Sequence, residues 1–101
     1  MRRMISYEVT LQVEPRLAAE VEDYTRQRHI PEIFATGCFR RIRFSLASPN
    51  RFRTSYQADG QADLDRYLRE HAPRFRADFQ TRFPEGITLT RETWVQRETW
   101  S

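Results

Sequence analysis

The feature that most constrains the fold is a strict alternation of residue character near the N-terminus. Apolar and polar residues alternate from Ile5 to Val13, with the apolar residues at the odd positions. Successive side chains of a β-strand point to opposite faces of a sheet, so the pattern predicts a strand with one buried face and one polar face. The chain therefore begins with a strand from a sheet that is covered on one side.

A helix is predicted to follow this strand. Pro15 suits the first turn of a helix, and apolar residues then recur at helical spacing as far as His29. Pro31 lies just beyond, and a proline inside a helix lacks the N–H that the helix needs. We therefore expect the helix to end before Pro31 and a separate short helical turn to follow, which Gly37 would end.

The second half of the chain predicts two strands, a helix and a last strand. Residues 38–47 and 51–57 both alternate, and the Ser-Pro-Asn turn between them predicts a hairpin. Apolar residues between Leu64 and Phe83 keep a helical period, and Pro73 should kink this helix. A further alternating segment, which begins at Ile87, predicts the last strand.

The order strand, helix, strand, strand, helix, strand predicts an α+β fold, the ferredoxin-like βαββαβ sandwich. Its four-stranded antiparallel sheet carries two helices on one face. At 101 residues the chain forms one domain, residues 1–101, with residues 96–101 as a C-terminal tail. The uncovered face should carry Glu8, Phe39, Arg41, Arg43, Arg53, Thr90, Glu92 and Trp94.

Composition narrows the classes of partner. The chain has no lysine, and its 17 basic residues stand against 14 acidic ones for a formal net charge of +3. The arginines are interleaved with acids, so charge alone does not indicate a nucleic-acid partner. Cys38 is the lone cysteine, which fits a reducing compartment. No apolar run approaches the roughly 20 residues of a membrane span, so we expect a cytoplasmic protein with no membrane partner.

Several short strings carry a resemblance to a known family. They are Tyr7-Glu8-Val9-Thr10-Leu11, His29-Ile30-Pro31-Glu32, Ala35-Thr36-Gly37-Cys38-Phe39, Tyr67-Leu68, His71-Ala72-Pro73, Arg76-Ala77-Asp78 and Arg82-Phe83-Pro84. In this order they resemble a small family of uncharacterised bacterial proteins, a domain of unknown function, over nearly the whole chain. The last dozen residues depart from it, because Arg91-Glu92-Thr93-Trp94 recurs as Arg97-Glu98-Thr99-Trp100.

That resemblance implies a fold and no catalytic residues. The fold is similar to the dimeric α/β-barrel group, in which two ferredoxin-like sheets face each other, as in antibiotic-biosynthesis monooxygenases. The resemblance therefore implies a homodimer. For the dimer interface we predict Glu8, Phe39, Trp94 and Trp100, because large aromatic side chains on a sheet surface usually mark an interaction site.

A candidate ligand-binding group lies on the predicted hairpin. Arg41 and Arg43 share one strand face, and Arg53 can lie beside them, so the three could hold a carboxylate or phosphate. In the alternative interpretation these arginines are solvated or pair across strands with Glu8 and Glu92. The sequence leaves both interpretations open.

Four residues are candidates for acid–base or nucleophilic chemistry. His29, Glu32 and Cys38 lie close together along the chain, and His71 lies on the apolar stripe of the second helix. In the alternative interpretation all four have structural roles, such as packing or pairing with a helix terminus. No metal-ligand spacing and no Gly-rich phosphate loop occurs, so we expect no metal and no cofactor.

Three functions follow from these patterns. The first is a small homodimeric protein that binds a small molecule between the sheet and the helices or inside the dimer, with anions among the candidates. The second is a cofactor-free enzyme of the monooxygenase or isomerase kind. The third is single-stranded RNA binding, which is the least expected, because the third strand lacks the Gly-aromatic pattern of RNA-recognition motifs.

Overall fold

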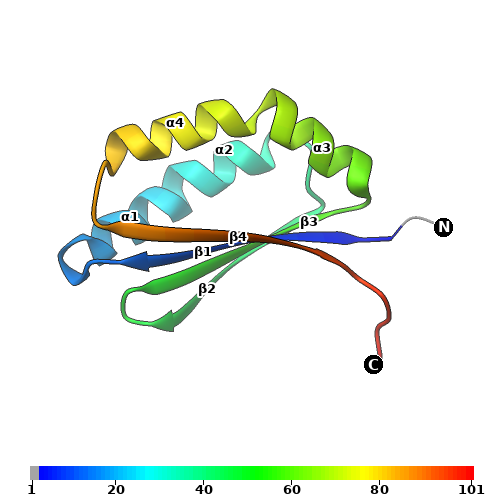
Figure 1. The fold of residues 1–101 in the computed structure, drawn as a ribbon, viewed down its shortest axis with the longest axis horizontal. Coiled ribbons are helices and arrows are strands. Elements are labelled where there is room, and N and C mark those ends of the chain that lie inside the picture. The colour runs from blue at the N-terminus through cyan, green and yellow to red at the C-terminus, as the bar shows by residue number, and fades with distance from the viewer. Residues whose placement is uncertain (1–2) are drawn as a thin grey trace.

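The structure is a computed structural model that describes residues 3–101. Its elements are β1 (Ile5–Val13), a helical run that contains α1 (Ala18–Tyr24) and α2 (Ile30–Phe34), β2 (Arg41–Ser48), β3 (Arg51–Ala58), α3 (Gln61–Glu70), α4 (Ala72–Arg82) and β4 (Ile87–Val95). The strands form one antiparallel sheet in the order β2-β3-β1-β4, and all helices lie over one face of it (Figure 1). This is the predicted ferredoxin-like α+β fold.

Strand register decides which side chains face the helices. Glu8 lies opposite Ser55 of β3 and Glu92 of β4, and Ser55 lies opposite Arg43 of β2. These four residues form one row on the face away from the helices, which we call the outer face. Arg41 shares that face through its pairing with Gln57. The prediction that Glu8, Arg41 and Arg43 point away from the helices is confirmed.

The inner face of the sheet, below the helices, carries the core. Two clusters of buried side chains meet at Val9, which is partly buried and packs against both. One cluster is centred on aromatic residues, among them Tyr7, Tyr56, Tyr67 and Phe75. Packing of these large rings between the helices and the sheet is the main source of stability for a domain of this size.

The first helical run is longer than the sequence predicts. It continues from Pro15 to Phe34 through a 3₁₀ turn, α1, a π-helical segment (Thr25–His29) and α2. The predicted break before Pro31 is therefore wrong. The Ile30 N–H donates to the carbonyl of Thr25, five residues back, which makes a wide π-helical turn. The helix continues through this turn to Pro31, although proline has no N–H to donate.

Phe39 lies on the other side of the sheet from its predicted place. It is 4% exposed, and its ring centroid lies 5.2 Å from that of Tyr56 and 4.8 Å from that of Tyr67, below the helices. The alternation does not extend to this residue, because β2 begins only at Arg41. Cys38 and Phe39 precede the strand and are both buried, so Phe39 cannot belong to an outer-face interface.

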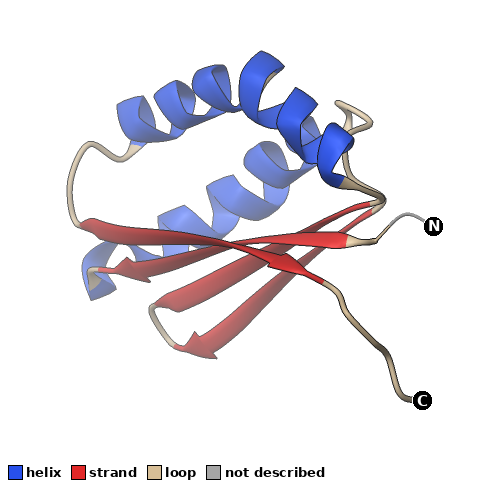
Figure 2. Cartoon of the chain, turned by 45° about the vertical axis from the view of Figure 1, so that its right-hand side comes forward, coloured by secondary structure: helices blue, strands red, loops and turns tan. Residues whose placement is uncertain are grey.

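The second helix is broken where the sequence predicts a kink. Helix α3 ends before His71, and α4 begins at Ala72 with Pro73 in its first turn (Figure 2). The N–H of His71 donates to the carbonyl of Tyr67. The ring of His71 stacks on that of Tyr67, and its Nδ1 lies 2.7 Å from an Arg74 nitrogen. His71 therefore has a structural position at the junction of the two helices.

The C-terminal residues leave the sheet. Strand β4 ends at Val95, and the chain beyond it runs away from the fold without regular structure (Figure 1). Trp94 is 56% exposed on the outer face, and Trp100 is 81% exposed in the tail. Among residues 3–101, no helix has both the length and the apolar character to cross a membrane.

Candidate functional site

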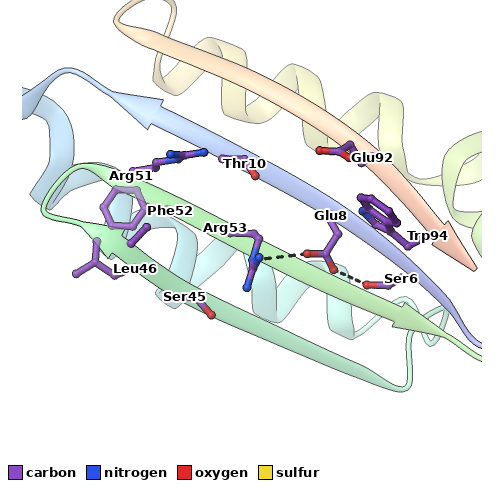
Figure 3. Close-up of a pocket in the computed structure, with 11 residues that line it drawn as sticks. Ser6, Glu8, Thr10, Ser45, Leu46, Arg51, Phe52, Arg53, Glu92 and Trp94 are labelled. Carbon is purple, nitrogen blue, oxygen red and sulfur yellow. Dashed lines mark hydrogen bonds and ion pairs between the residues drawn. The ribbon is translucent and has the colours of Figure 1, made fainter. Parts of the chain in front are cut away.

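Two concave regions lie on opposite sides of the sheet. The first, which we call the outer groove, has a volume of about 660 Å³ and crosses the face away from the helices (Figure 3). Glu8, Arg53, Glu92 and Trp94 are among its lining residues. The sequence predicted these four residues on one uncovered face, and the structure brings them together there.

Glu8 is the most constrained side chain of the outer groove. Its side chain is 18% exposed, and its Oε2 accepts hydrogen bonds from the hydroxyls of Ser6 and Ser55. Its Oε1 lies 3.6 Å from Nε of Arg53. Glu92 stands directly opposite Glu8 on the neighbouring strand, so two carboxylates face the same part of the groove.

The predicted arginine cluster is only partly available to a ligand. Arg53 pairs with Glu8, as the alternative interpretation holds. Arg41 and Arg43 lie on the outer face but do not line the outer groove. The outer face is thus divided, with arginines on β2 and β3 and carboxylates on β1 and β4.

The second concave region, which we call the inner pocket, lies between the helices and the inner face of the sheet. Its volume is about 120 Å³, and α3, α4, the π-helical segment and strands β1, β3 and β4 all contribute to its walls. The lining combines apolar rings such as Phe75 and Phe79 with the hydroxyl-bearing side chains of Tyr7 and Thr25. A lining that is mostly apolar with a few polar groups is typical of a ligand site.

Thr25 and His29 give this pocket its most unusual property. Thr25 is 2% exposed, and both residues line the pocket from the π-helical segment, four positions apart. Within residues 3–101, the Oγ1 of Thr25 and the Nδ1 of His29 are the buried side-chain polar atoms that have no hydrogen-bond partner. An unpaired buried polar atom costs about 1–3 kcal/mol, and a bound molecule that pairs with it would remove this cost.

Burial keeps the imidazole of His29 neutral. Loss of solvent lowers the pKa of His29 from 6.5 to about 4, and the nearby Asp78 carboxylate opposes this only in part. The ring lies 5.3 Å from that of Phe79 and 6.2 Å from that of Phe75, measured between centroids. A neutral imidazole in the wall of a pocket can accept a hydrogen bond from a bound molecule.

Tyrosine hydroxyls and arginines form the other polar part of the pocket. Arg76 of α4 donates a 3.0 Å hydrogen bond to the hydroxyl of Tyr7. Burial raises the pKa values of Tyr56 and Tyr67, whereas the charge of Arg91 acts to lower both. These phenols therefore remain protonated and serve as hydrogen-bonding groups.

The predicted catalytic residues do not gather at one site. Only His29 lines the inner pocket. Glu32 pairs with Arg28 on the surface at 3.6 Å, Cys38 is buried in the core, and His71 lies at the junction of the two helices. Within residues 3–101, no three His, Cys, Asp or Glu side chains lie together as metal ligands would.

Sequence reasoning missed Thr25, Arg76 and Arg91 as site residues. One available signal was the four-residue spacing of Thr25 and His29, which places two polar side chains on one helix face. Another was Arg91, which stands at an inward position of β4, opposite Val9. The meeting of these residues with α4 depends on how the helices lie over the sheet, which periodicity does not specify.

Solved structures with a similar fold come from several bacteria. A protein from Shewanella oneidensis has a TM-score of 0.76 and 15% identity, with 95% of this chain and 93% of that chain covered. A monooxygenase from Streptomyces coelicolor, in complex with Nanaomycin D, has a TM-score of 0.73 and 13% identity over 99% of this chain and 93% of that chain. SnoaB, a cofactor-independent oxygenase from Streptomyces nogalater, has a TM-score of 0.66 and 14% identity over 96% of each chain.

These identities are low, and the likeness to the three structures shows the fold alone. No curated protein matches the sequence. A family model covers residues 4–96, which is nearly the whole chain. The chain belongs to the family described as Domain of unknown function (DUF4286).

Proposed function

We propose that this protein is a homodimer that binds a small organic molecule, about one ring in size, in the inner pocket. The observation that supports the binding most strongly is the pair of buried polar atoms without partners, Thr25 Oγ1 and His29 Nδ1. A ligand that bears a hydroxyl would satisfy both atoms and remove their desolvation cost. The Streptomyces coelicolor monooxygenase of the same fold was solved with a bound small molecule.

The volume of the inner pocket sets the size of the ligand. An apolar cavity of about 150 Å³ is known to hold benzene. The inner pocket, at about 120 Å³, is of comparable size and is lined by Phe75 and Phe79 on its apolar side. A phenol-sized ring would place its apolar body against these rings and its hydroxyl towards Thr25 and His29.

Binding of 4-fluorophenol, followed by fluorine NMR, tests this proposal. Thr25→Val removes the unpartnered hydroxyl at nearly constant volume, so we expect about tenfold weaker binding. Thr10→Val is the matched control, because Thr10 lines the outer groove instead. Equal affinity in the wild type and Thr25→Val, or weakening only in Thr10→Val, would contradict the proposal.

The proposed homodimer uses the outer face. The row Arg43, Ser55, Glu8, Glu92 crosses the sheet from its positive side to its negative side. A two-fold axis parallel to the strands would reverse this row in the second copy, so that Arg43 of one copy meets Glu92 of the other. Trp94, which is 56% exposed, would be covered in the same contact. Both features suit an isologous interface.

Charge reversal tests the dimer and its symmetry together. We expect Arg43→Glu alone to shift sedimentation-velocity profiles of the full chain towards the monomer, because two carboxylates would then meet across the axis. The double variant Arg43→Glu with Glu92→Arg should restore the dimer. Arg69→Glu on α3 is the control. A wild type that sediments as a monomer at tens of micromolar would refute the dimer, and a double variant that stays monomeric would refute the axis.

A second candidate function is cofactor-independent oxygenation of the bound ring. The neutral imidazole of His29 favours it, because it can accept a hydrogen bond from the hydroxyl of a bound phenol and so make the ring more electron-rich towards dioxygen. One oxygen atom of dioxygen would enter the ring while the other leaves as water. Dioxygen consumption with hydroquinone should then be faster with the wild type than with His29→Gln or with buffer. Equal rates in all three would leave ligand binding as the function.

A further inference from the structure

We infer that the molecule held in the inner pocket is an aromatic carboxylate, whose charged group lies at Arg76 and Arg91. This inference rests on the proposed function and names the chemical class of the ligand. The lining of the pocket includes these two arginines and no Asp or Glu. Both arginines are exposed, so they lie at the open side of the pocket, and two cations with no carboxylate among the lining residues favour an anion there.

Arg91 lines the exposed side of the inner pocket. It is exposed, at a place of the edge strand β4 that faces the helix side of the sheet, opposite Val9. No ion pair within residues 3–101 involves Arg91, although Arg53, Arg40 and Arg28 each pair with a carboxylate. Its guanidinium is therefore available to a ligand in the inner pocket.

Arg76 approaches the pocket from the opposite wall, on α4. One of its terminal nitrogens donates to the Tyr7 hydroxyl at 3.0 Å, which orients the guanidinium and leaves further N–H groups for a second acceptor. The charges of Arg76 and Arg91 both act to lower the pKa of Tyr67, so both lie near the same phenol. A planar carboxylate suits such a pair of planar donors.

The rest of the pocket accounts for the aromatic part. Phe75 and Phe79 supply apolar ring surface, and Thr25 and His29 supply the unpartnered polar atoms. A ring with a carboxylate on one side and a hydroxyl on the other would pair its carboxylate with the arginines, pack its ring against the phenylalanines and place its hydroxyl at the unpartnered polar atoms. Hydroxybenzoates are the simplest molecules of this class.

Isothermal titration with benzoate and with its neutral analogue benzamide tests the inference at neutral pH. The wild type should bind benzoate at least about tenfold more tightly than benzamide. Hydrogen bonds to a charged group are stronger than neutral ones, and the difference in free energy corresponds to about tenfold in affinity. Arg91→Met should abolish that preference while benzamide affinity stays unchanged. Arg41→Met is the matched control, since Arg41 lies on the outer face.

The outcomes separate this inference from the proposed function. Equal binding of benzoate and benzamide by the wild type would overturn the inference but leave a pocket that holds a neutral ring. Loss of benzoate binding in Arg41→Met, with Arg91→Met unaffected, would overturn it by placing the anion on the outer face. Binding of neither probe, with 4-fluorophenol also unbound, would overturn both the inference and the proposed function.

Discussion

Thr25 shows how a residue can cost stability and still suit a function. Its hydroxyl is buried in the π-helical segment without a partner, and the Nδ1 of His29, four residues further on, also has none. A π-helical turn is rare and occurs often at functional sites. The structure therefore joins two independent signs of a binding site in the same five residues.

Replacing Thr25 with valine should stabilise the ligand-free protein. The change removes a buried hydroxyl that has no partner and keeps the shape of the side chain, so we expect a gain of about 1 kcal/mol in the free energy of unfolding. Urea denaturation measures it. Thr36→Val is the contrasting variant, because the Thr36 hydroxyl donates to the Ile33 carbonyl at 2.7 Å and accepts from the Cys38 N–H at 3.3 Å.

The two variants should therefore change stability in opposite directions. Thr36→Val should lower the free energy of unfolding by about 1 kcal/mol, since it removes hydrogen bonds that end the first helical run. A loss of stability in Thr25→Val would mean that its hydroxyl has a partner in solution, and the main support for the inner pocket as a binding site would be gone.

His29 should make the protein sensitive to acid. Its pKa is about 4 in the folded state and 6.5 in the unfolded chain, so the unfolded chain binds the proton first as pH falls. The stability associated with neutral His29 is present in full above about pH 6.5 and is lost towards about pH 4. Between about pH 7 and pH 4.5 the expected loss is about 2 kcal/mol.

Urea denaturation of the wild type and His29→Gln at both pH values measures this loss. Carboxylates contribute to acid unfolding in both proteins, so the difference between the two pH dependences isolates His29. We expect the wild type to lose about 2 kcal/mol more than His29→Gln. Parallel pH dependences would show that His29 is solvated and accepts protons freely.

At the scale of elements, two glycines shape the turns that lead from helices to strands. Gly37 (φ +76°) and Gly86 (φ +88°) both adopt the left-handed backbone region that other residues avoid. A β-carbon on Gly37 would meet nothing within 4 Å, whereas one on Gly86 would lie 2.7 Å from a Leu17 methyl carbon and 3.3 Å from the Glu14 carboxylate. Gly86 thus allows the turn into β4 to pack against the start of the first helical run.

Alanine at these two glycines should therefore differ in effect. Gly37→Ala should cost about 1 kcal/mol from backbone strain alone. Gly86→Ala should cost about 2 kcal/mol, because Leu17 must also move. The midpoint of thermal unfolding measures the loss of stability in each variant. Equal losses would show that the start of the first helical run yields easily and does not fix the position of β4.

The alternation of residue character predicted the sheet well, but not beyond its paired residues. It assigned the outer-face positions of Glu8, Arg43 and Glu92, because period-two patterning depends only on local strand geometry. It misplaced Phe39, which lies before the first paired residue of β2 and turns into the core. The prediction of a break before Pro31 was wrong, because the π-helical turn lets the helix continue through the proline.

At the scale of the whole molecule, the two faces of the sheet have different uses in our account. The outer face carries a charge pattern suited to a second copy, and the inner pocket lies on the other side, below the helices. The sequence predicted the uncovered face and a ligand either between the sheet and the helices or inside the dimer, but it did not predict most of the residues that line the inner pocket. The pocket needs α4, the π-helical segment and β4 to meet, and such long-range packing leaves no periodic signal in the sequence.

The most direct test of the inner pocket as a ligand site is a crystal of the full chain soaked in 4-bromophenol, with the bromine located by anomalous scattering. Our account predicts a bromine peak between the helices and the sheet, with the ring beside Phe75 and Phe79 and the hydroxyl towards Thr25 and His29. A peak found only in the outer groove, or no ordered peak while both regions are open to solvent in the lattice, would contradict it.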